Sequence, residues 1–265
     1  MTVQPWAQWH AEHERQLADP HGFLAITSLN FLTGIPRRFP DAPGEWSTRA
    51  DGVVVDLADG ETLIVDGRTV TGRHAFGVIG ERSGVNVRAG DAVIEVAKRG
   101  GFDIVRPRHP DHPLRLAFHG TPAYEPDPRW VVTGRFVPFD APRDVTVGAA
   151  VEGLEHVYES PGRVEFEVDG TPLALTVFNG RTPGSFFALF ADRTSGVTTY
   201  AANRSLAIEP PAADGTVVLD FTRATNLPCA YTDFATCPLP PAENRLPIAV
   251  EAGEKIPYER LAPAR

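Results

Sequence analysis

A stretch near the C-terminal end of the chain gathers the residue types that could do chemistry. Residues 220–255 read DFTRATNLPCAYTDFATCPLPPAENRLPIAVEAGEK and contain both cysteines of the chain, Cys229 and Cys237. The prolines spread through this stretch fix φ and remove backbone donors, so it cannot form a regular helix or a central strand. We therefore expect a stiff capping loop over a β-sheet, with its polar and sulfur groups turned toward a pocket beneath it.

The two cysteines admit several interpretations, which the sequence leaves open. A free cysteine commonly behaves as a small buried hydrophobe. A metal site at Cys229 and Cys237 would need two further ligands, which His119 or His156 could supply through the fold. A nucleophilic or redox-active cysteine would need a neighbouring cation to lower its pKa. A disulfide between the two would form only under oxidation.

Charged and amide side chains of the same region also support two interpretations. Arg223 and Asp220 could form an ion pair that clamps the loop. Alternatively, arginine forks such as that of Arg204 could hold a carboxylate or phosphate group of a ligand. Asn226 and Asn244 could fix the loop backbone through Asx turns, or they could present their amides to the same ligand.

Two tyrosines and one histidine complete the set. Tyr200 and Tyr231 could line the mouth of a pocket, and His119 could act as an acid or base because its unperturbed pKa lies near neutrality. No nucleophile–base pair is recognisable from spacing, so the sequence assigns no reaction, no catalytic residue and no cofactor. The candidate ligand-binding residues are Arg204, Asp220, Arg223, Asn226, Cys229, Tyr231, Cys237, Asn244, Tyr200 and His119.

Several motifs of this chain are similar to those of a known family. They are the DFTRATNLPCAY, TCPLPP, NRL and AGEK runs, the upstream FFALFADRTSGVTTYAANRSL segment and the N-terminal DPHGFLAITSLNFLTG stretch. With these runs the chain resembles the bacterial and archaeal domain-of-unknown-function family numbered 1684. Three positions depart from the family pattern: Thr222 replaces an asparagine, Leu227-Pro228 replaces a double proline, and residues 201–203 replace a glycine-rich turn. The resemblance implies kinship and a shared fold, but no activity.

The elements that must position these residues begin with a helix. Trp6, Trp9, His13 and Leu17 recur at steps of three and four residues, which predicts a helix over 6–17 whose aromatic face packs on a sheet. Asp19-Pro20 ends it, because a residue before proline avoids the helical region. A second, shorter helix is predicted over 21–32, and a stop at 34–36 completes an N-terminal helical segment, 1–36, packed on the same domain as the rest.

After residue 36 the pattern changes to short β-like runs separated by Asp-Gly and Asn-Gly pairs, which supply the positive φ values of tight hairpins. Loops are expected at 106–113 and 138–144. This pattern predicts a single, mainly antiparallel β domain over 37–265, a barrel being slightly favoured over a sandwich. The predicted strands are 53–55, 63–65, 93–96, 114–118, 130–136, 164–168, 173–178, 185–190 and 217–221.

Composition narrows the class of protein. The formal net charge of −9 lacks the positive field that attracts phosphate backbones, which argues against nucleic acid as a partner. Dinucleotide-binding, P-loop, zinc-protease, nucleophile-elbow and CxxC motifs are absent from the sequence. No signal-like or bilayer-spanning apolar run is present, so we expect a cytoplasmic protein without a membrane partner.

Two functional hypotheses follow, with a third beside them. In the first, a polar pocket under the 220–255 loop binds a small molecule, and an anionic ligand would suit its arginines. In the second, the same loop is a structural lid that completes the core, and function resides in a protein partner or a homodimer. In the third, Cys229 and Cys237 bind a metal ion.

Overall fold

Asp-Gly turns set the hairpins of this chain. The computed structural model describes residues 5–261. Asp66 and Gly67 adopt φ values of 48° and 76°, and they join strands β5 (Leu63–Val65) and β6 (Arg68–Val70). Asp169 and Gly170, at 49° and 77°, join β12 (Glu155–Val168) and β13 (Thr171–Asn179) in the same way. Two successive positive φ values match the twist of the strands that flank such a turn.

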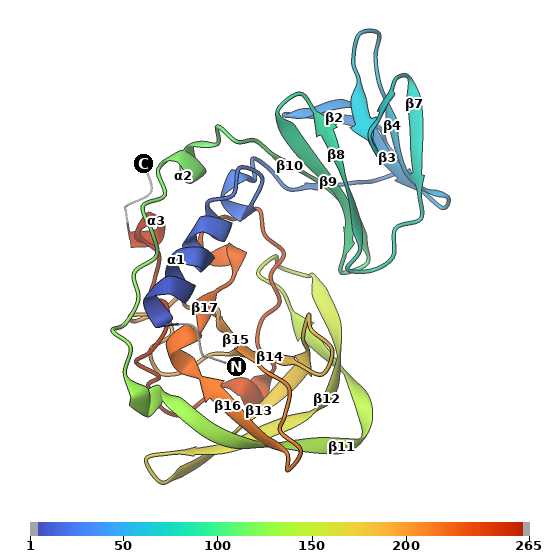
Figure 1. Cartoon of the computed structure of the whole chain (residues 1–265). Coiled ribbons are helices and arrows are strands. Elements are labelled where there is room, and N and C mark those ends of the chain that lie inside the picture. The colour runs from blue at the N-terminus through green and yellow to red at the C-terminus, as the bar shows by residue number, and fades with distance from the viewer. Residues whose placement is uncertain (1–4, 262–265) are drawn as a thin grey trace. The chain divides into compact units, whose positions relative to one another are not determined.

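The described residues form two compact units. Unit 1 comprises 5–14, 120–231 and 236–261, and unit 2 comprises Arg15–His119 and Thr232–Ala235. Helix α1 (Trp6–Leu17), drawn in blue in Figure 1, therefore begins in unit 1 and ends in unit 2. Residue 36, where the helical segment was predicted to end, lies inside unit 2.

Unit 2 contains two antiparallel sheets around one core. The core includes Trp46, Val55 and Ile94, which are fully buried. The six-stranded sheet has the order β1 (Asn30–Phe31), β10 (Phe102–Arg108), β9 (Ala92–Arg99), β8 (Gly84–Ala89), β5 and β6. The four-stranded sheet has the order β2 (Arg37–Phe39), β3 (Ala42–Arg49), β4 (Gly52–Asp56) and β7 (Arg73–Gly77).

Unit 1 is built on one seven-stranded antiparallel sheet. Its core centres on Phe221, whose ring packs against Trp130, Phe166 and Phe190. In Figure 1 the long β11–β12 hairpin curves along one side of this sheet. The sheet order is β16 (Thr216–Asp220), β11 (Val131–Gly148), β12, β13, β14 (Phe186–Phe190), β15 (Arg204–Ile208) and β17 (Thr225–Asn226).

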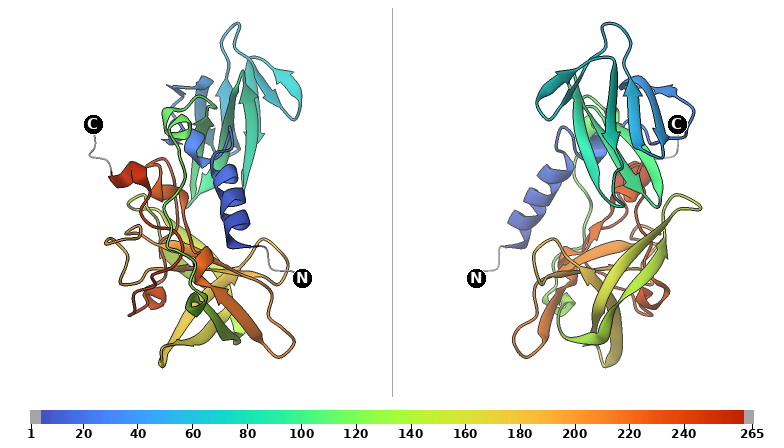
Figure 2. Two further views of the ribbon diagram at one scale, coloured as in Figure 1. Left: turned by 60° about the vertical axis from the view of Figure 1, so that its left-hand side comes forward. Right: turned by 90° about the vertical axis from the view of Figure 1, so that its right-hand side faces the viewer.

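The chain that follows β16 is irregular, as its prolines predict, and Figure 2 draws it in orange and red beside the strands of unit 1. It contributes Leu246, Val250 and Ala252 to the core of unit 1. Short helical turns interrupt it. They are η3 (Phe221–Arg223), η4 (Pro228–Ala230), η5 (Ala242–Asn244) and α3 (Tyr258–Leu261), and the remaining short helices of the chain are η1 (Phe23–Ala25), α2 (Pro113–Leu116) and η2 (Pro128–Trp130).

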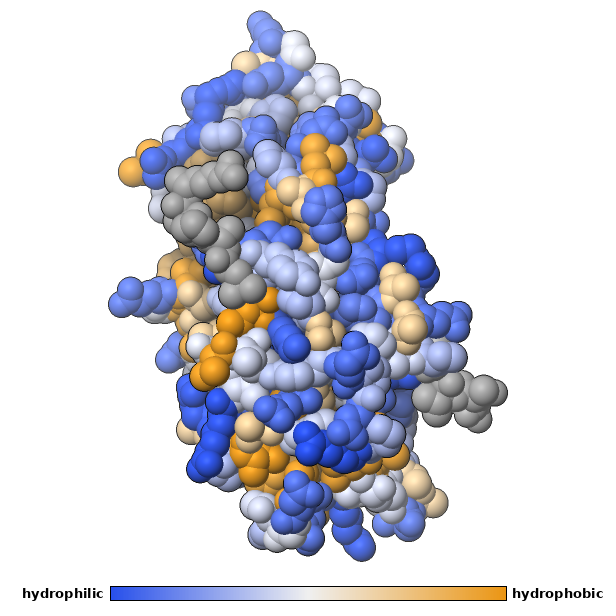
Figure 3. All heavy atoms as spheres, turned by 90° about the vertical axis from the view of Figure 1, so that its left-hand side faces the viewer, coloured by the Kyte–Doolittle hydropathy of each residue, from blue (hydrophilic) through white to orange (hydrophobic). Residues whose placement is uncertain are grey.

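The predicted mainly β class is confirmed, with corrections. Among the described residues the three sheets are open and sandwich-like, so the slight preference for a barrel was wrong. No described helix is long and apolar enough to cross a bilayer. On the face drawn in Figure 3, hydrophobic residues form separate patches among hydrophilic ones.

Three local predictions were also wrong. The helix predicted over 21–32 is only η1, because the chain then extends to pair Ile26 with Arg108 and β1 with β10. The strand predicted over 114–118 is instead helix α2, which Pro113 initiates with its preset φ. The loop predicted over 138–144 lies within β11, where the pairing with β12 shifts register between Pro138 and Arg143.

Candidate functional site

Glu254 is the most enclosed carboxylate in the 220–255 loop, at 1% exposure. The backbone holds it from two sides, since Glu254 N donates to Ala224 O at 2.9 Å and Lys255 N donates to Pro122 O at 2.7 Å. Gly253, just before it, has φ +73°, and a Cβ there would lie 2.5 Å from Ala224 O. Only glycine fits at that position, so the AGEK run fixes where the Glu254 carboxylate lies.

The Glu254 carboxylate joins three segments of unit 1. Its Oε2 accepts a hydrogen bond from Asn226 N at 2.6 Å and lies 3.5 Å from the Tyr231 hydroxyl. Its Oε1 lies 3.1 Å from His13 Nε2 of helix α1. We call the group formed by His13, Thr121, Asn226, Tyr231 and Glu254, together with His10 one turn earlier on the same helix, the Glu254 cluster.

Tyr231 is a buried hydrogen-bonding group of this cluster. Its hydroxyl lies 2.8 Å from Thr121 Oγ1, within hydrogen-bond distance. Burial, followed by the negative charge of Glu254, raises the pKa of Tyr231 well above its ordinary value. The phenol therefore stays protonated at neutral pH and can donate a hydrogen bond.

Helix α1 supplies the two histidines from its aromatic face. The ring of Trp6 stacks on His10 at 4.7 Å between centroids, and the ring of Trp9 stacks on His13 at 5.7 Å. The helix is anchored by Trp6 Nε1, which donates to Thr222 O at 2.8 Å. Residues 6–17 thus form the predicted helix, and each of its two indoles stacks on the imidazole four residues later.

Four buried polar atoms of the Glu254 cluster have no hydrogen-bond partner among the described residues. They are His10 Nε2, His13 Nε2, Asn226 Oδ1 and Glu254 Oε1. The His13 and Glu254 atoms attract each other at 3.1 Å without forming an aligned hydrogen bond. Buried polar groups in native proteins are nearly always paired. Glu254 Oε1 and His13 Nε2 are thus only loosely paired, and an imidazole beside a carboxylate is an arrangement suited to proton transfer.

The side chains of His10 and His13 are 13% and 23% exposed. The two imidazoles are therefore partly accessible to solvent, while the Glu254 carboxylate is buried. Sequence reasoning placed two of its residues, Asn226 and Tyr231, among the candidates but missed His10, His13 and Glu254. A signal was present, because the histidines share the helix face of Trp6 and Trp9, and Glu254 belongs to the AGEK run.

Arg204 lies next to the cluster but is engaged elsewhere. Its side chain is 1% exposed and pairs with Asp192 at 2.8 Å. Other donors of the guanidinium go to the carbonyl oxygens of Val250, Ala252 and Glu254. Burial lowers the pKa of Arg204, and the charge of Asp192 opposes this effect. The guanidinium thus clamps the loop to the sheet, which is the first of the two roles considered for the arginines.

Asp220 and Arg223 form a second pair, 3.1 Å apart between Oδ2 and Nε. Asp220 caps the short helix η3, where its side chain accepts from Thr222 N. The guanidinium of Arg223 lies 5.3 Å from the centre of the Trp9 ring. This pair therefore borders the aromatic face of α1, whereas Asn226 and Tyr231 contact the Glu254 carboxylate.

Asn244 and His119 lie apart from the cluster. The Asn244 side chain is fully buried and bonds to the backbone of Thr176 and Leu189. His119 is exposed and belongs to unit 2. Neither of these two predicted residues contacts Glu254 in the hydrogen bonds and ion pairs of the structure.

Cys229 and Cys237 come together at a separate point of the loop. Cys229 N donates to Cys237 Sγ at 3.2 Å, and the two residues are 4% and 6% exposed. The hydroxyl of Tyr200 also hydrogen-bonds the Cys229 side chain. Nearby, the Nε2 of buried His156 donates to Thr236 O at 2.6 Å. Among the described residues, no three His, Cys, Asp or Glu side chains are grouped so as to hold a metal ion.

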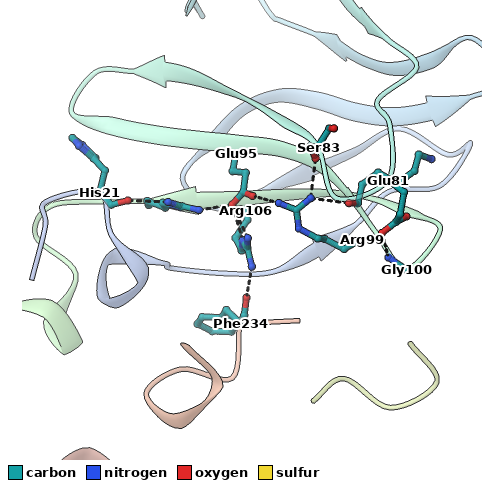
Figure 4. Close-up of polar contacts among 10 residues, drawn as sticks. His21, Glu81, Ser83, Glu95, Arg99, Gly100, Arg106 and Phe234 are labelled. Atoms are coloured by element: carbon teal, nitrogen blue, oxygen red, sulfur yellow. Dashed lines mark hydrogen bonds and ion pairs between the residues drawn. The ribbon is translucent and has the colours of Figure 1, made fainter. Parts of the chain in front are cut away.

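A second charged group lies in unit 2, where Arg99, Arg106 and Arg108 all contact the buried carboxylate of Glu95. Figure 4 labels Glu95, Arg99 and Arg106 of this group. Most guanidinium donors are used within the fold. Arg99 also donates to Ser83 O, and Arg106 donates to Phe234 O. We therefore interpret this group as structural.

The larger cavities do not coincide with the predicted residues. In unit 1 a cavity of about 660 Å³ lies over β12 and β13, lined by Arg143, Arg163, Thr176 and Glu243 among others. In unit 2 a cavity of about 600 Å³ is lined by residues that include Arg38, Glu61 and His109. None of the ten sequence-predicted residues lines either cavity.

Comparison with known proteins gives kinship and no activity. A family model described as "Protein of unknown function (DUF1684)" matches residues 116–255, which leaves the N-terminal stretch outside the matched range. No curated protein matches. The solution NMR structure of an uncharacterized protein from gene locus rrnAC0354 of Haloarcula marismortui is 31% identical, with a TM-score of 0.45. The match covers 53% of this chain and 78% of that one.

Proposed function

The chain belongs to the DUF1684 family of proteins of unknown function, and from this premise we propose that the Glu254 cluster binds a small polar molecule that donates hydrogen bonds. The observation that carries the proposal is the pairing of a 1% exposed carboxylate with an imidazole, in which Glu254 Oε1 and His13 Nε2 lie 3.1 Å apart without an aligned hydrogen bond. Burying such groups costs free energy unless a partner satisfies them.

The charges of the cluster indicate what charge its ligand carries. The arginines that suggested an anionic ligand are engaged, Arg204 with Asp192 and Arg223 with Asp220. Glu254 Oε1, which faces His13 Nε2 at 3.1 Å, and Asn226 Oδ1 are acceptors without an aligned hydrogen bond among the described residues. A carboxylate repels an anion and attracts a hydroxyl, an amine or an ammonium group. The ligand of this proposal is therefore neutral or cationic, and the half-buried indoles of Trp6 and Trp9 offer it an apolar wall.

The test uses probes of defined charge. We would titrate the purified protein with glycerol, ethanolamine and acetate, and follow the histidine ring resonances by NMR, assigned with His10→Gln and His13→Gln. Glycerol or ethanolamine is expected to shift the His10 and His13 signals, and Glu254→Gln is expected to weaken the effect at least about tenfold. Glu243→Gln, an exposed glutamate of the same loop, is the matched control. Larger shifts with acetate, or unchanged binding in Glu254→Gln, would refute the proposal.

A structural lid is the second candidate function. It is favoured by the clamps at Arg204 and Asn244 and by the burial of Leu246 and Val250 in the core of unit 1. The same variants separate the two candidates. A large drop in melting temperature for Glu254→Gln, with no probe shifting His10 or His13 in the wild type, would favour the lid and a protein partner or homodimer as the seat of function.

The cell compartment is also a proposal. Cys229 and Cys237 are both reduced thiols. Thiols persist in a reducing compartment, which favours the cytoplasm. Thiol-trapping with an alkylating reagent in intact cells tests this point, because an oxidising compartment would leave the pair unreactive.

A further inference from the structure

The two cysteines of the chain lie against each other although eight positions separate them in sequence. The backbone N of Cys229 donates to Cys237 Sγ at 3.2 Å, and the two thiols hydrogen-bond each other. A sulfur so close to the Cys229 backbone lies within a few ångströms of the Cys229 side chain. A disulfide needs its Cβ atoms roughly 3.5–4.5 Å apart.

The surroundings of Cys229 favour its thiolate. The hydrogen bond from Cys237 lowers the pKa of Cys229, burial opposes this effect, and the charge of Arg260 and the hydroxyl of Tyr200 lower the pKa further. Arg260 is held in place by its own hydrogen bonds, which go to Cys229 O at 3.0 Å and to Ala230 O at 3.2 Å. Thiolates react with peroxides and disulfides, whereas neutral thiols do so poorly.

The pair also has a distinctive place along the chain. The chain leaves unit 1 after Tyr231, contributes Thr232–Ala235 to unit 2, and returns at Thr236. Cys229 lies just before this excursion and Cys237 lies just after it. A bond between their sulfurs would therefore close the excursion into a small covalent ring.

We propose that Cys229 and Cys237 form a redox-active dithiol in which Cys229 is the attacking thiol and Cys237 the resolving thiol, with hydrogen peroxide as oxidant. The Cys229 thiolate attacks one peroxide oxygen, the O–O bond breaks, and the leaving hydroxide takes up a proton to become water. Cys229 is then a sulfenic acid. The Cys237 sulfur attacks it, the S–O bond breaks, and a second water leaves as the disulfide forms. Two electrons pass from the sulfurs to the peroxide, and an external dithiol reverses the change.

This inference is independent of the Glu254 cluster, because neither cysteine contributes to that site. It goes beyond the small-molecule function and assigns chemistry to the two thiols themselves. The buried position of the pair restricts the oxidant to a small molecule, since 4% and 6% exposure admits hydrogen peroxide more readily than a protein disulfide.

The test follows the fate of each thiol. The reduced full-length protein is treated with one equivalent of hydrogen peroxide, together with a cysteine peptide of ordinary pKa as an internal control for the oxidant. We expect an intact mass lower by two hydrogen atoms, a peptide that links Cys229 to Cys237, and recovery of both thiols with dithiothreitol. Three outcomes would each overturn the proposal. They are protein thiols that remain alkylatable while the control peptide is oxidised, disulfides between protein molecules, and sulfinic acids.

Single variants assign the two roles. Cys237→Ser should keep the fast reaction but stop at a Cys229 sulfenic acid that dimedone traps. Cys229→Ser should slow the loss of the remaining thiol at least about tenfold. Unfolding the wild-type protein in guanidinium should remove the advantage of Cys229, because the lowered pKa depends on the fold. Equal rates in the two variants would refute the assignment of Cys229 as the attacking thiol.

Discussion

The side chain of Asn244 pairs with the backbone of Thr176 in both directions. Its Oδ1 accepts from Thr176 N at 2.8 Å, and its Nδ2 donates to Thr176 O at 2.8 Å. The same Nδ2 donates to Leu189 O at 2.8 Å. One fully buried amide thus takes the place of a neighbouring strand, because it hydrogen-bonds the backbone of both β13 and β14. It fastens the capping loop to the sheet of unit 1.

We predict that Asn244→Asp destabilises the protein by about 3–5 kcal/mol. The substitution preserves the shape but turns a carboxylate oxygen toward the carbonyl oxygens of Thr176 and Leu189. Guanidinium denaturation of the two proteins measures the loss. Glu209→Gln, at an exposed position of unit 1, should cost less than about 0.5 kcal/mol. An Asn244→Asp protein as stable as the wild type would contradict the clamp.

Arg204 supports a second prediction because its fork serves several acceptors at once. Arg204→Lys keeps the charge beside Asp192 but cannot reach the carbonyls of Val250 and Ala252 together. We expect a loss of about 2–4 kcal/mol in the free energy of unfolding. Arg135→Lys, at an exposed position of β11, should change stability by less than about 0.5 kcal/mol. Equal effects of the two substitutions would show that the Arg204 fork contributes nothing beyond its charge.

The buried carboxylate of Glu95 should make the stability of unit 2 depend on pH in the acid range. Burial acts to raise its pKa, but the charges of Arg106 and Arg108 outweigh this and hold the pKa below its ordinary value of 4.5. A carboxyl group whose pKa is lower in the folded state stabilises the fold above its unfolded-state pKa, and this stabilisation is lost as pH falls through the folded value. We therefore expect unit 2 to lose stability below about pH 4.5.

Hydrogen exchange of peptides from β9 and β10, followed from pH 6 downward, measures that effect. Glu95→Gln should lower protection at neutral pH, because three arginines then lose their shared anion, and it should flatten the acid dependence. Glu45→Gln removes an exposed glutamate of β3 and should leave both properties unchanged. A wild-type protein whose β9 protection is the same at pH 6 and pH 3 would contradict the prediction.

Local chemistry explains which parts of the fold were predictable. Asp66-Gly67 and Asp169-Gly170 dictate hairpins within two residues, and the repeat of Trp6, Trp9 and His13 dictates a helix face. These signals need no knowledge of the rest of the chain. The helix predicted over 21–32 failed because Ile26 and Asn30 find partners in β10, a segment far along the chain, and such pairing overrides local preference.

The candidate site was less predictable for the same physical reason. Asn226 and Tyr231 stood out because they lie in an unusual, proline-rich stretch. His13 and Glu254 lie near opposite ends of the chain, and only the fold brings their side chains within 3.1 Å. The arginine fork of Arg204 looks identical in sequence whether it holds a ligand or the carbonyls of Val250 and Ala252, so its clamp role required coordinates.

The phenol of Tyr231, which belongs to the Glu254 cluster, should affect the stability of the protein at high pH. Its pKa is raised in the fold, so the neutral phenol stabilises the folded state fully below its unfolded-state pKa near 10, and that stabilisation is lost as pH rises toward the folded value. We expect ultraviolet titration of the native protein to show one of its five tyrosines ionising well after the others. Tyr231→Phe should remove that late step and reduce the loss of unfolding free energy between about pH 9 and pH 11. Tyr258→Phe, at an exposed position, should preserve both. If all five tyrosines of the folded wild type ionise together, the phenol of Tyr231 is not buried beside Glu254 and the Glu254 cluster is not enclosed.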